Sequence, residues 1–268
     1  METVSFFQKR IRYEERGTGE PLILIHGVGL DYTMWQMQME KLSDQFRVIA
    51  YDMIGHGGSE HPPAPYSLSQ FVEQLAMLLD YLQIEKAHLV GFSMGGMVAQ
   101  AFTLEYAHKV KTLTIMSAVA NRTASQREAV LERVKEVKKN GPSATIEPAI
   151  QRWFSEDFMM KHKEIVENVR NRLKQNNPAS YLASYTLFAT ADQLLFPKLH
   201  TIEVPTLIVT GEEDIGSNPK MAKQMGTEIA SSQVVIVPGM KHMLPIEGAE
   251  IVNETIHSFI EKQSNVVR

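Results

Sequence analysis

Ser93 lies in a segment whose residue types could activate a hydroxyl group for nucleophilic attack. It is the central residue of a Gly-x-Ser-x-Gly motif that it forms with Gly91 and Gly95. An apolar run of strand length precedes the motif, and an apolar segment of helical length follows it. We therefore expect a sharp strand-to-helix turn, a nucleophile elbow, in which a Cβ at either glycine would clash. The N-terminus of the helix would then face the oxyanion that forms during acyl transfer.

Ser93 has a second interpretation, because serine is also a common residue at the start of helices. A capping box requires Glu or Gln three residues after the serine, and that position is Gly96. The capping interpretation is therefore the weaker one, and we expect Ser93 to act as the nucleophile.

Asp214 and His242 could complete a proton relay with Ser93. Each of the three residues lies just beyond a short apolar run of strand length. In a mostly parallel sheet that helices cover on both faces, functional groups gather at the carboxyl ends of the strands. A histidine can take the proton of a serine, and an aspartate can fix the tautomer of that histidine. We therefore predict that Ser93, Asp214 and His242 are the catalytic residues.

Other residues of the same types have competing interpretations. Glu212 and Glu213 precede Asp214 on the same loop, so they are rival acids. His26 follows a buried strand and lies beside a tight turn, where a histidine is more often a hydrogen-bonded structural group than a catalytic one.

Asp52, His56 and Ser59 also form a set of triad residue types, within eight residues of sequence. A triad needs side chains that converge from separate loops, whereas glycine-rich spacing as tight as this is typical of turns. We expect this loop to have a structural role.

The composition limits the kinds of partner and cofactor. The 268 residues carry a net charge of −4, with basic and acidic residues interspersed, so we expect a small-molecule substrate rather than nucleic acid or an anionic membrane. There is no cysteine, which excludes disulfides, catalytic thiolates and cysteine-bound metals. We see no set of metal ligands and expect no cofactor. The first ten residues lack a signal-peptide pattern, so we expect a cytoplasmic location.

Strands and helices alternate along the chain except in one segment. Residues 119–200 contain charged helical segments and large apolar residues in place of strands. We interpret this segment as a helical lid inserted into a core formed by 1–118 and 201–268. Its aromatic residues could line a substrate pocket or form the lid's own core, and the candidates for the pocket are Trp153, Phe154, Tyr185 and Phe188.

Four arginines of the lid leave a further alternative open. They could bind an anionic substrate or lie on solvated helix faces, and they are Arg122, Arg127, Arg133 and Arg152.

The order Ser93, Asp214, His242 is that of the α/β-hydrolase fold, which the chain resembles. The segments His26–Trp35 and Gly91–Gln100 look like those of small capped carboxylesterases and 3-oxoadipate enol-lactonases. This resemblance implies a mostly parallel eight-stranded sheet flanked by helices, with an inserted helical lid. It also implies that the backbone N–H groups of Val28 and Met94 form the oxyanion hole, and that Asp214, rather than a neighbouring glutamate, is the acid.

The resemblance implies a serine hydrolase that cleaves carboxylic esters or lactones of small to medium acyl chain through an acyl-enzyme. A serine at the elbow, in place of aspartate, disfavours dehalogenase and epoxide hydrolase chemistry. Two alternatives stay open: an enol-lactonase of the type used in aromatic degradation, and a signalling receptor of the same fold. The sequence predicts neither the individual substrate nor the oligomeric state.

Overall fold

The computed structural model describes residues 2–6 and 9–266, and in them eight strands form one sheet in the order β1-β2-β4-β3-β5-β6-β7-β8. The strands are β1 (Glu2–Phe6), β2 (Lys9–Arg16), β3 (Glu20–Ile25), β4 (Phe46–Tyr51), β5 (Ala87–Phe92), β6 (Val110–Met116), β7 (Thr206–Gly211) and β8 (Ser232–Val237). β1 pairs with β2 and β2 with β4 in antiparallel fashion, and all other neighbours are parallel. The predicted mostly parallel eight-stranded sheet is confirmed.

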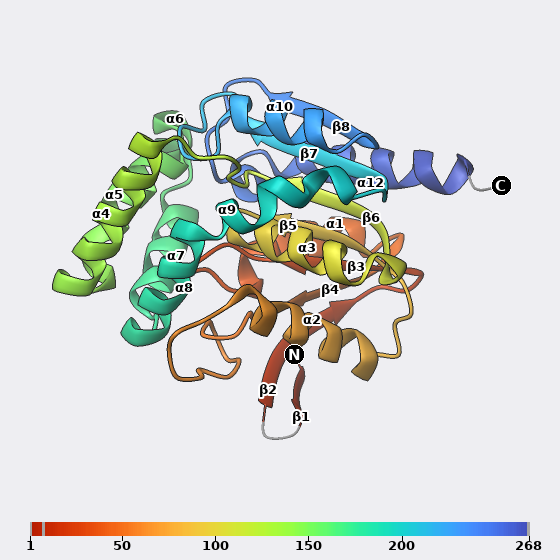
Figure 1. The fold of residues 1–268 in the computed structure, drawn as a ribbon, viewed down its shortest axis with the longest axis horizontal. Coiled ribbons are helices and arrows are strands. Elements are labelled where there is room, and N and C mark those ends of the chain that lie inside the picture. Colours follow the sequence, from red (N-terminus) through yellow and green to blue (C-terminus); the bar gives the residue numbers. More distant parts are fainter. Residues whose placement is uncertain (1, 7–8, 267–268) are drawn as a thin grey trace.

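The central strands are apolar on both faces because helices cover both sides of the sheet. All six residues of β5 and all six of β7 are buried. Along β3, Ile23 and Ile25 pack with α2 and α3, whereas Leu22 and Leu24 pack with α1 and α12 on the opposite face (Figure 1). Successive side chains of a strand point to opposite faces of the sheet. A parallel strand that is buried on both faces therefore has apolar residues at successive positions.

Helices connect the strands and follow the last one. The α-helices are α1 (Gln36–Leu42), α2 (Leu68–Tyr81), α3 (Met94–Glu105), α4 (Ala124–Asn140), α5 (Ile146–Trp153), α6 (Glu156–Lys161), α7 (Lys163–Lys174), α8 (Pro178–Thr190), α9 (Asp192–Leu195), α10 (Pro219–Glu228), α11 (Leu244–Glu247) and α12 (Ala249–Val266). The 3₁₀ helices are η1 (Tyr32–Trp35), η2 (Ala107–Lys109), η3 (Pro142–Thr145) and η4 (Phe196–Thr201). α2 begins at the predicted cap, Ser67, which forms a capping box with Gln70.

The helices α4 to α8 form a group at one end of the sheet, between β6 and β7 in the chain (Figure 1). After them, α9 and η4 pack against α3 and so return the chain to the core. The observed helices therefore fill the segment that we interpret as the lid.

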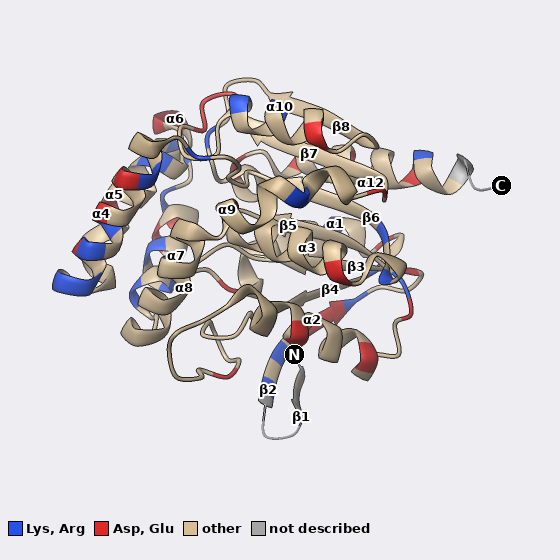
Figure 2. Cartoon of the chain, viewed as in Figure 1, with Lys and Arg blue, Asp and Glu red and all other residues tan. Residues whose placement is uncertain are grey.

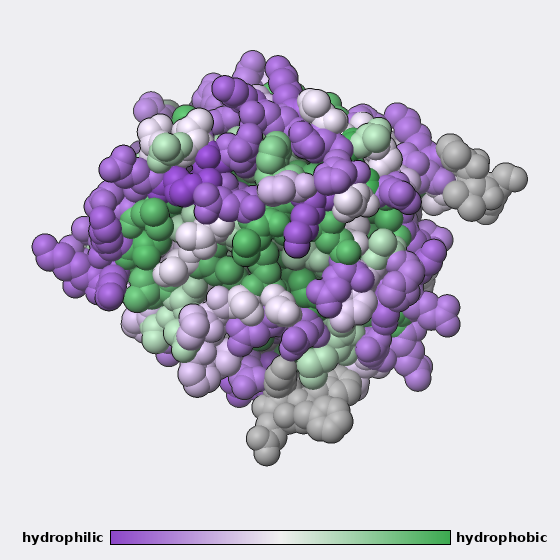
Figure 3. Space-filling model, viewed as in Figure 1, coloured by the Kyte–Doolittle hydropathy of each residue, from purple (hydrophilic) through white to green (hydrophobic). Residues whose placement is uncertain are grey.

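Charged and apolar residues gather in different places on one face of the molecule. Charged residues of both signs are spread along α4, α5 and α7 (Figure 2). On the same side of the molecule, apolar residues gather over α3 and α9 (Figure 3). Among the described residues, no helix combines the length and the apolar character needed to cross a bilayer.

Candidate active site

Ser93 occupies the turn between β5 and α3 in a strained backbone conformation. Its φ is 54° and its ψ is −115°, a combination that a residue with a Cβ rarely adopts. The backbone N–H of Ser93 donates to the carbonyl of Met116 on β6 (2.8 Å), which fixes the turn to the sheet. The Ser93 side chain makes no capping hydrogen bond with α3. The hydroxyl is therefore not engaged in capping the helix that follows it.

The two glycines of the motif allow the close approach that this turn needs. A Cβ at Gly91 would collide with the carbonyl oxygen of Gly95. A Cβ at Gly95 would collide with the carbonyl oxygens of Ile25 and His26 at the end of β3. The predicted reason for both glycines is confirmed, and the first turn of α3 is pressed against the end of β3.

Asp214 and His242 meet beyond the ends of β7 and β8. His242 Nδ1 lies 2.7 Å from Asp214 Oδ2. The other carboxylate oxygen, Oδ1, accepts hydrogen bonds from the backbone N–H groups of Gly216 and Ser217, each at 2.9 Å. Burial alone would raise the pKa of Asp214, but the charge of His242 and these hydrogen bonds together lower it below its ordinary value. A carboxylate that stays ionised can hold the Nδ1–H tautomer of the imidazole, which leaves Nε2 as a proton acceptor.

Neither rival acid on this loop makes a hydrogen bond or ion pair with His242. Glu212 is exposed, and its carboxylate accepts the backbone N–H of Gly239 (3.1 Å). Glu213 is also exposed. Among the residues described, Asp214 is the acid that contacts His242.

A cavity of about 200 Å³ brings the predicted catalytic residues together with the lid. Ser93, Asp214 and His242 all line it, and they are 4%, 3% and 8% exposed. A cavity of this size lies below the usual range for drug-sized ligands, so it suits a small substrate. Ile215, Gly216 and Ser217 also line the cavity. The sequence analysis missed these three residues because they have no marked chemistry of their own.

Val28 and Met94, the predicted oxyanion-hole residues, belong to two segments close to Ser93. Val28 lines the cavity, and the neighbouring Gly27 packs so closely that a Cβ there would lie 3.3 Å from the Cβ of Ser93. Met94 is buried at the first position of α3. Neither backbone N–H donates to an acceptor within the part of the chain that the structure describes. Both groups therefore remain candidates to bind an oxyanion.

His26 supports this loop instead of taking part in the relay. It is fully buried, Nδ1 lies 2.7 Å from the carbonyl of Gly27, and Nε2 accepts the backbone N–H of Met53 (2.9 Å). Burial lowers the pKa of His26 to about 3, so the ring is neutral at pH 7. Its two hydrogen bonds connect the loops that follow β3 and β4.

The second set of triad residue types does not converge. The carboxylate of Asp52 accepts the backbone N–H groups of Tyr32 (2.9 Å) and Gly58 (2.7 Å). His56 Nδ1 lies 3.0 Å from the carbonyl of Ile54, and the hydroxyl of Ser59 donates to the backbone carbonyl of Asp52 (2.6 Å). All three side chains bind backbone groups, as the structural interpretation predicts.

Three of the four predicted pocket residues line the cavity. Trp153, Tyr185 and Phe188 do so, and the ring of Trp153 lies 5.9 Å from that of His242. Phe154 does not line the cavity, because its side chain is fully buried and stacks on Phe158 with a centroid distance of 5.3 Å. Neighbouring residues at the end of a helix point in different directions, and here the second one enters the core.

The lid contacts the loop that carries His242. The backbone N–H of Met243 donates to the carbonyl of Trp153 (3.0 Å). The carboxylate of Glu247 accepts the N–H of Ser155 (3.1 Å), the residue that caps the N-terminus of α6. The lid is therefore fixed to the segment that carries His242. Sequence reasoning missed these contacts because each joins positions about 90 residues apart.

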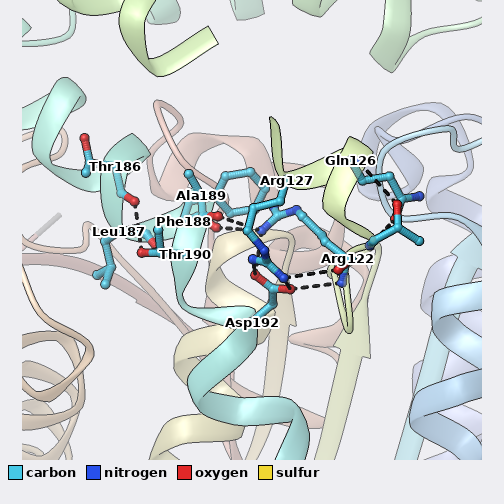
Figure 4. Close-up of polar contacts among 10 residues, drawn as sticks. Arg122, Gln126, Arg127, Thr186, Leu187, Phe188, Ala189, Thr190 and Asp192 are labelled. Atoms are coloured by element: carbon cyan, nitrogen blue, oxygen red, sulfur yellow. Dashed lines mark hydrogen bonds and ion pairs between the residues drawn. The ribbon is translucent and has the colours of Figure 1, made fainter. Parts of the chain in front are cut away.

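Two of the lid arginines share a buried counterion. Asp192 is fully buried, and its carboxylate accepts hydrogen bonds from Arg122 and Arg127 (3.0 Å each) (Figure 4). Arg122 also donates to the carbonyl of Phe188 (3.0 Å) and lies over its ring, 4.6 Å from the centroid. Because Arg122 lies near the start of the lid and Asp192 near its end, this ion pair connects the two ends.

The chain matches known proteins over nearly its whole length. The sequence model described as the alpha/beta hydrolase fold matches residues 20–249. A hydrolase of (E)-2-((N-methylformamido)methylene)succinate from Acinetobacter baylyi is 32% identical, covering 93% of each chain. An enol-lactonase from Burkholderia xenovorans LB400 superposes with a TM-score of 0.91 at 26% identity, covering 97% of this chain and all of the other. A thermophilic esterase from Thermogutta terrifontis, solved with malate bound, gives a TM-score of 0.87 at 31% identity, covering 95% and 94%.

Proposed function

The chain belongs to the alpha/beta hydrolase fold family, and we propose that it is a serine hydrolase that cleaves a small carboxylic ester or lactone through an acyl-enzyme. One observation carries this proposal. Ser93, in its strained turn, lines the same small cavity as His242, whose Nδ1 is held by Asp214. No other described Asp–His pair opens on a cavity with a serine in this way.

In the first half-reaction, the Ser93 oxygen attacks the carbonyl carbon while its proton passes to Nε2 of His242. The carbonyl oxygen becomes an oxyanion, which the N–H groups of Val28 and Met94 bind. When the tetrahedral intermediate collapses, the bond to the leaving oxygen breaks and His242 gives its proton to that oxygen. The acyl group remains on Ser93, and in a lactone the leaving alcohol stays attached to it.

In the second half-reaction, water repeats the same steps in place of serine. His242 takes a proton from water as the oxygen attacks the acyl carbon, and it returns that proton to Ser93 when the acyl bond breaks. The products are an acid and an alcohol. Asp214 stabilises the imidazolium in both halves, and its lowered pKa keeps it ionised for this task.

The substrate class rests on the relatives and on the cavity. One relative is named as a hydrolase of a substituted succinate, one structural neighbour as an enol-lactonase and another as an esterase. The cavity of about 200 Å³ has apolar walls formed by Trp153, Tyr185 and Phe188, which suits a short acyl group.

The test is turnover on a panel of simple esters and lactones. We expect many turnovers per active site with a steady rate. A receptor of the same fold would instead give one stoichiometric burst and keep a trapped adduct, and that result would contradict the enzyme proposal.

A further inference from the structure

Resting on the proposed function, we propose that the substrate carries a free carboxylate, which Arg152 and Arg133 bind while Ser93 attacks the scissile carbonyl. Both arginines line the cavity that contains Ser93. Arg152 comes from α5 and Arg133 from α4, so the two cations reach the cavity from different lid helices.

Arg152 is a cation without a protein acceptor. Within the described ranges, no carboxylate, carbonyl or hydroxyl accepts a hydrogen bond from its guanidinium, although the residue is more than half buried. Burial, followed by the positive charge of Arg133, lowers the pKa of Arg152. The hydroxyls of Tyr185 and Tyr181 are the groups that partly offset these effects. Because buried charges in proteins are normally paired, this arrangement favours an acceptor supplied by a ligand.

In the part of the chain that the structure describes, one neutral group accepts a hydrogen bond from Arg133. Its Nε donates to the hydroxyl of Tyr185 (3.1 Å), which leaves the other N–H groups of the guanidinium for another acceptor. Tyr185 is buried and lies in a row of near-parallel rings, 5.7 Å from Tyr181 and 5.9 Å from Phe188. The row restricts Tyr185 and so fixes the position of Arg133.

Arg122, the third lid arginine at this cavity, is neutralised by an acid of the protein. Arg122 lines the cavity too, but Asp192 binds it together with Arg127 (Figure 4). Among the described residues, no comparable acid faces Arg133 or Arg152, and Asp214 in the same cavity is bound to His242. The cavity therefore has a region of uncompensated positive charge.

A carboxylate fits this region better than a larger anion. Its planar oxygens match the fork of a guanidinium, and two guanidinium groups can share it. The cavity of about 200 Å³ must also hold the carbonyl that Ser93 attacks, which leaves limited room. The aromatic walls of Trp153 and Phe188 suit a short hydrocarbon segment between the two ends of the substrate.

The test compares esters that differ in charge at the far end of the acyl group. Mono(4-nitrophenyl) glutarate and adipate carry a terminal carboxylate. The matched neutral esters, 4-nitrophenyl 5-methylhexanoate and 6-methylheptanoate, carry an isopropyl group of similar shape. We expect kcat/KM for the better anionic ester to exceed that of its neutral match by roughly 10- to 100-fold, and added salt to reduce this ratio.

The variants assign the preference to the two arginines. Arg152→Met should reduce the ratio to near one, Arg152→Lys should retain part of it, and Arg133→Met should reduce it less. Arg170→Met is the matched control, because Arg170 belongs to the lid but pairs with Glu147 outside the cavity. It should leave the ratio unchanged. Melting temperatures show whether each variant is folded. If Arg152→Met does not fold, the ratio in Arg133→Met and its dependence on salt still test the site.

Three results would overturn the carboxylate site. They are equal kcat/KM for the charged and neutral esters in the wild type, a ratio that both methionine variants leave unchanged, and inhibition by inorganic phosphate as strong as that by glutarate. Glutarate binding, measured by calorimetry, requires no turnover. It therefore tests the site even if no ester is cleaved, a result that would count against the proposed function alone.

Discussion

Two sets of the same three residue types occur in this protein, and they behave in opposite ways. Ser93, Asp214 and His242 come from three loops and line one cavity. The second set, which we call the turn set, is Asp52, His56 and Ser59, whose side chains bind backbone groups of nearby loops. The difference shows that residue type does not define a relay. What matters is whether a polar atom is left free by the backbone to meet its partner. Asp214 Oδ2 contacts His242 although Oδ1 accepts two backbone N–H groups, whereas both oxygens of Asp52 accept backbone N–H groups.

The pKa values of Asp52 and Asp214 are shifted in opposite directions. Burial raises the pKa of Asp52 to about 6, despite two hydrogen bonds from backbone N–H groups. For Asp214 the charge of His242 and the hydrogen bonds outweigh burial, so its pKa is lowered. The two carboxylates differ because Asp214 has a neighbouring imidazole. Asp214 can therefore stabilise a cation, whereas Asp52 stabilises a turn.

The largest expected effect is at Ser93, the proposed nucleophile. Ser93→Ala should reduce kcat by about 10³-fold or more while the protein stays folded, because a small side chain still fits the elbow. Ser59→Ala should leave the activity of the folded protein within a few-fold, and it should lower the free energy of unfolding by about 1 to 3 kcal/mol through its lost hydrogen bonds. Ester hydrolysis and circular dichroism on both variants measure this. Near-normal activity in Ser93→Ala would reject the assignment of Ser93, Asp214 and His242 as catalytic residues.

The next effect separates the acids. Asp214→Asn should lower kcat by roughly 10²- to 10⁴-fold, because an amide no longer favours the productive tautomer of His242. Glu212→Gln and Glu213→Gln are matched controls on the same loop and should change kcat less than threefold or so, since surface changes are usually mild. A larger effect of either glutamate variant would show that Asp214 is not the acid that pairs with His242 in catalysis.

A smaller effect lies in the pH dependence of stability. Asp52 has a raised pKa, so the folded state binds its proton more tightly than the unfolded state does. The contribution of Asp52 to the free energy of unfolding therefore falls as pH rises from about 4 to 6. The stability cost of Asp52→Asn should therefore shrink over that range, by on the order of 2 to 3 kcal/mol. For Asp214, whose pKa is lowered, the cost of Asp214→Asn should grow as pH rises toward 4 and then stay constant. Urea unfolding at several pH values measures both curves. Parallel curves for the two variants would contradict the assigned electrostatics.

The smallest effect concerns the apolar walls of the cavity that Ser93, Asp214 and His242 line. Each methylene buried against Trp153 and Phe188 adds up to roughly 0.8 kcal/mol of transition-state binding, or about fourfold in kcat/KM. For neutral 4-nitrophenyl esters, kcat/KM should rise from two carbons to a short or medium chain and then fall as the cavity of about 200 Å³ fills. A flat profile from two to sixteen carbons would show that these residues do not contact the acyl group.

The residues that sequence alone located are those whose signals are local. Ser93 has its glycines two residues away on each side, and Asp214 and His242 each follow an apolar strand, so short windows of sequence were enough. The sheet followed from the same alternation of strands and helices. Within the loop after β4, the tight spacing of glycines correctly indicated a turn.

In the lid, the sequence did not predict which side chains face the cavity or which acids pair with the arginines. No local pattern distinguishes Trp153, which faces the cavity, from Phe154, which enters the core. The roles of the arginines depend on Asp192, which lies 70 residues after Arg122 in the chain. Packing between distant helices decides both questions, and one sequence carries no direct signal of it.

The central claim, that Ser93 and not another serine forms the covalent intermediate, can be measured directly with a fluorophosphonate that reacts with activated serines. After inactivation, intact mass and peptide mapping should show one adduct per chain, on the peptide containing Ser93, with activity lost in proportion to labelling. The peptide containing Ser59 should be unmodified, because its hydroxyl is already bound to the Asp52 carbonyl. Full activity after stoichiometric labelling of Ser93, or inactivation with the adduct on another residue, would contradict the claim.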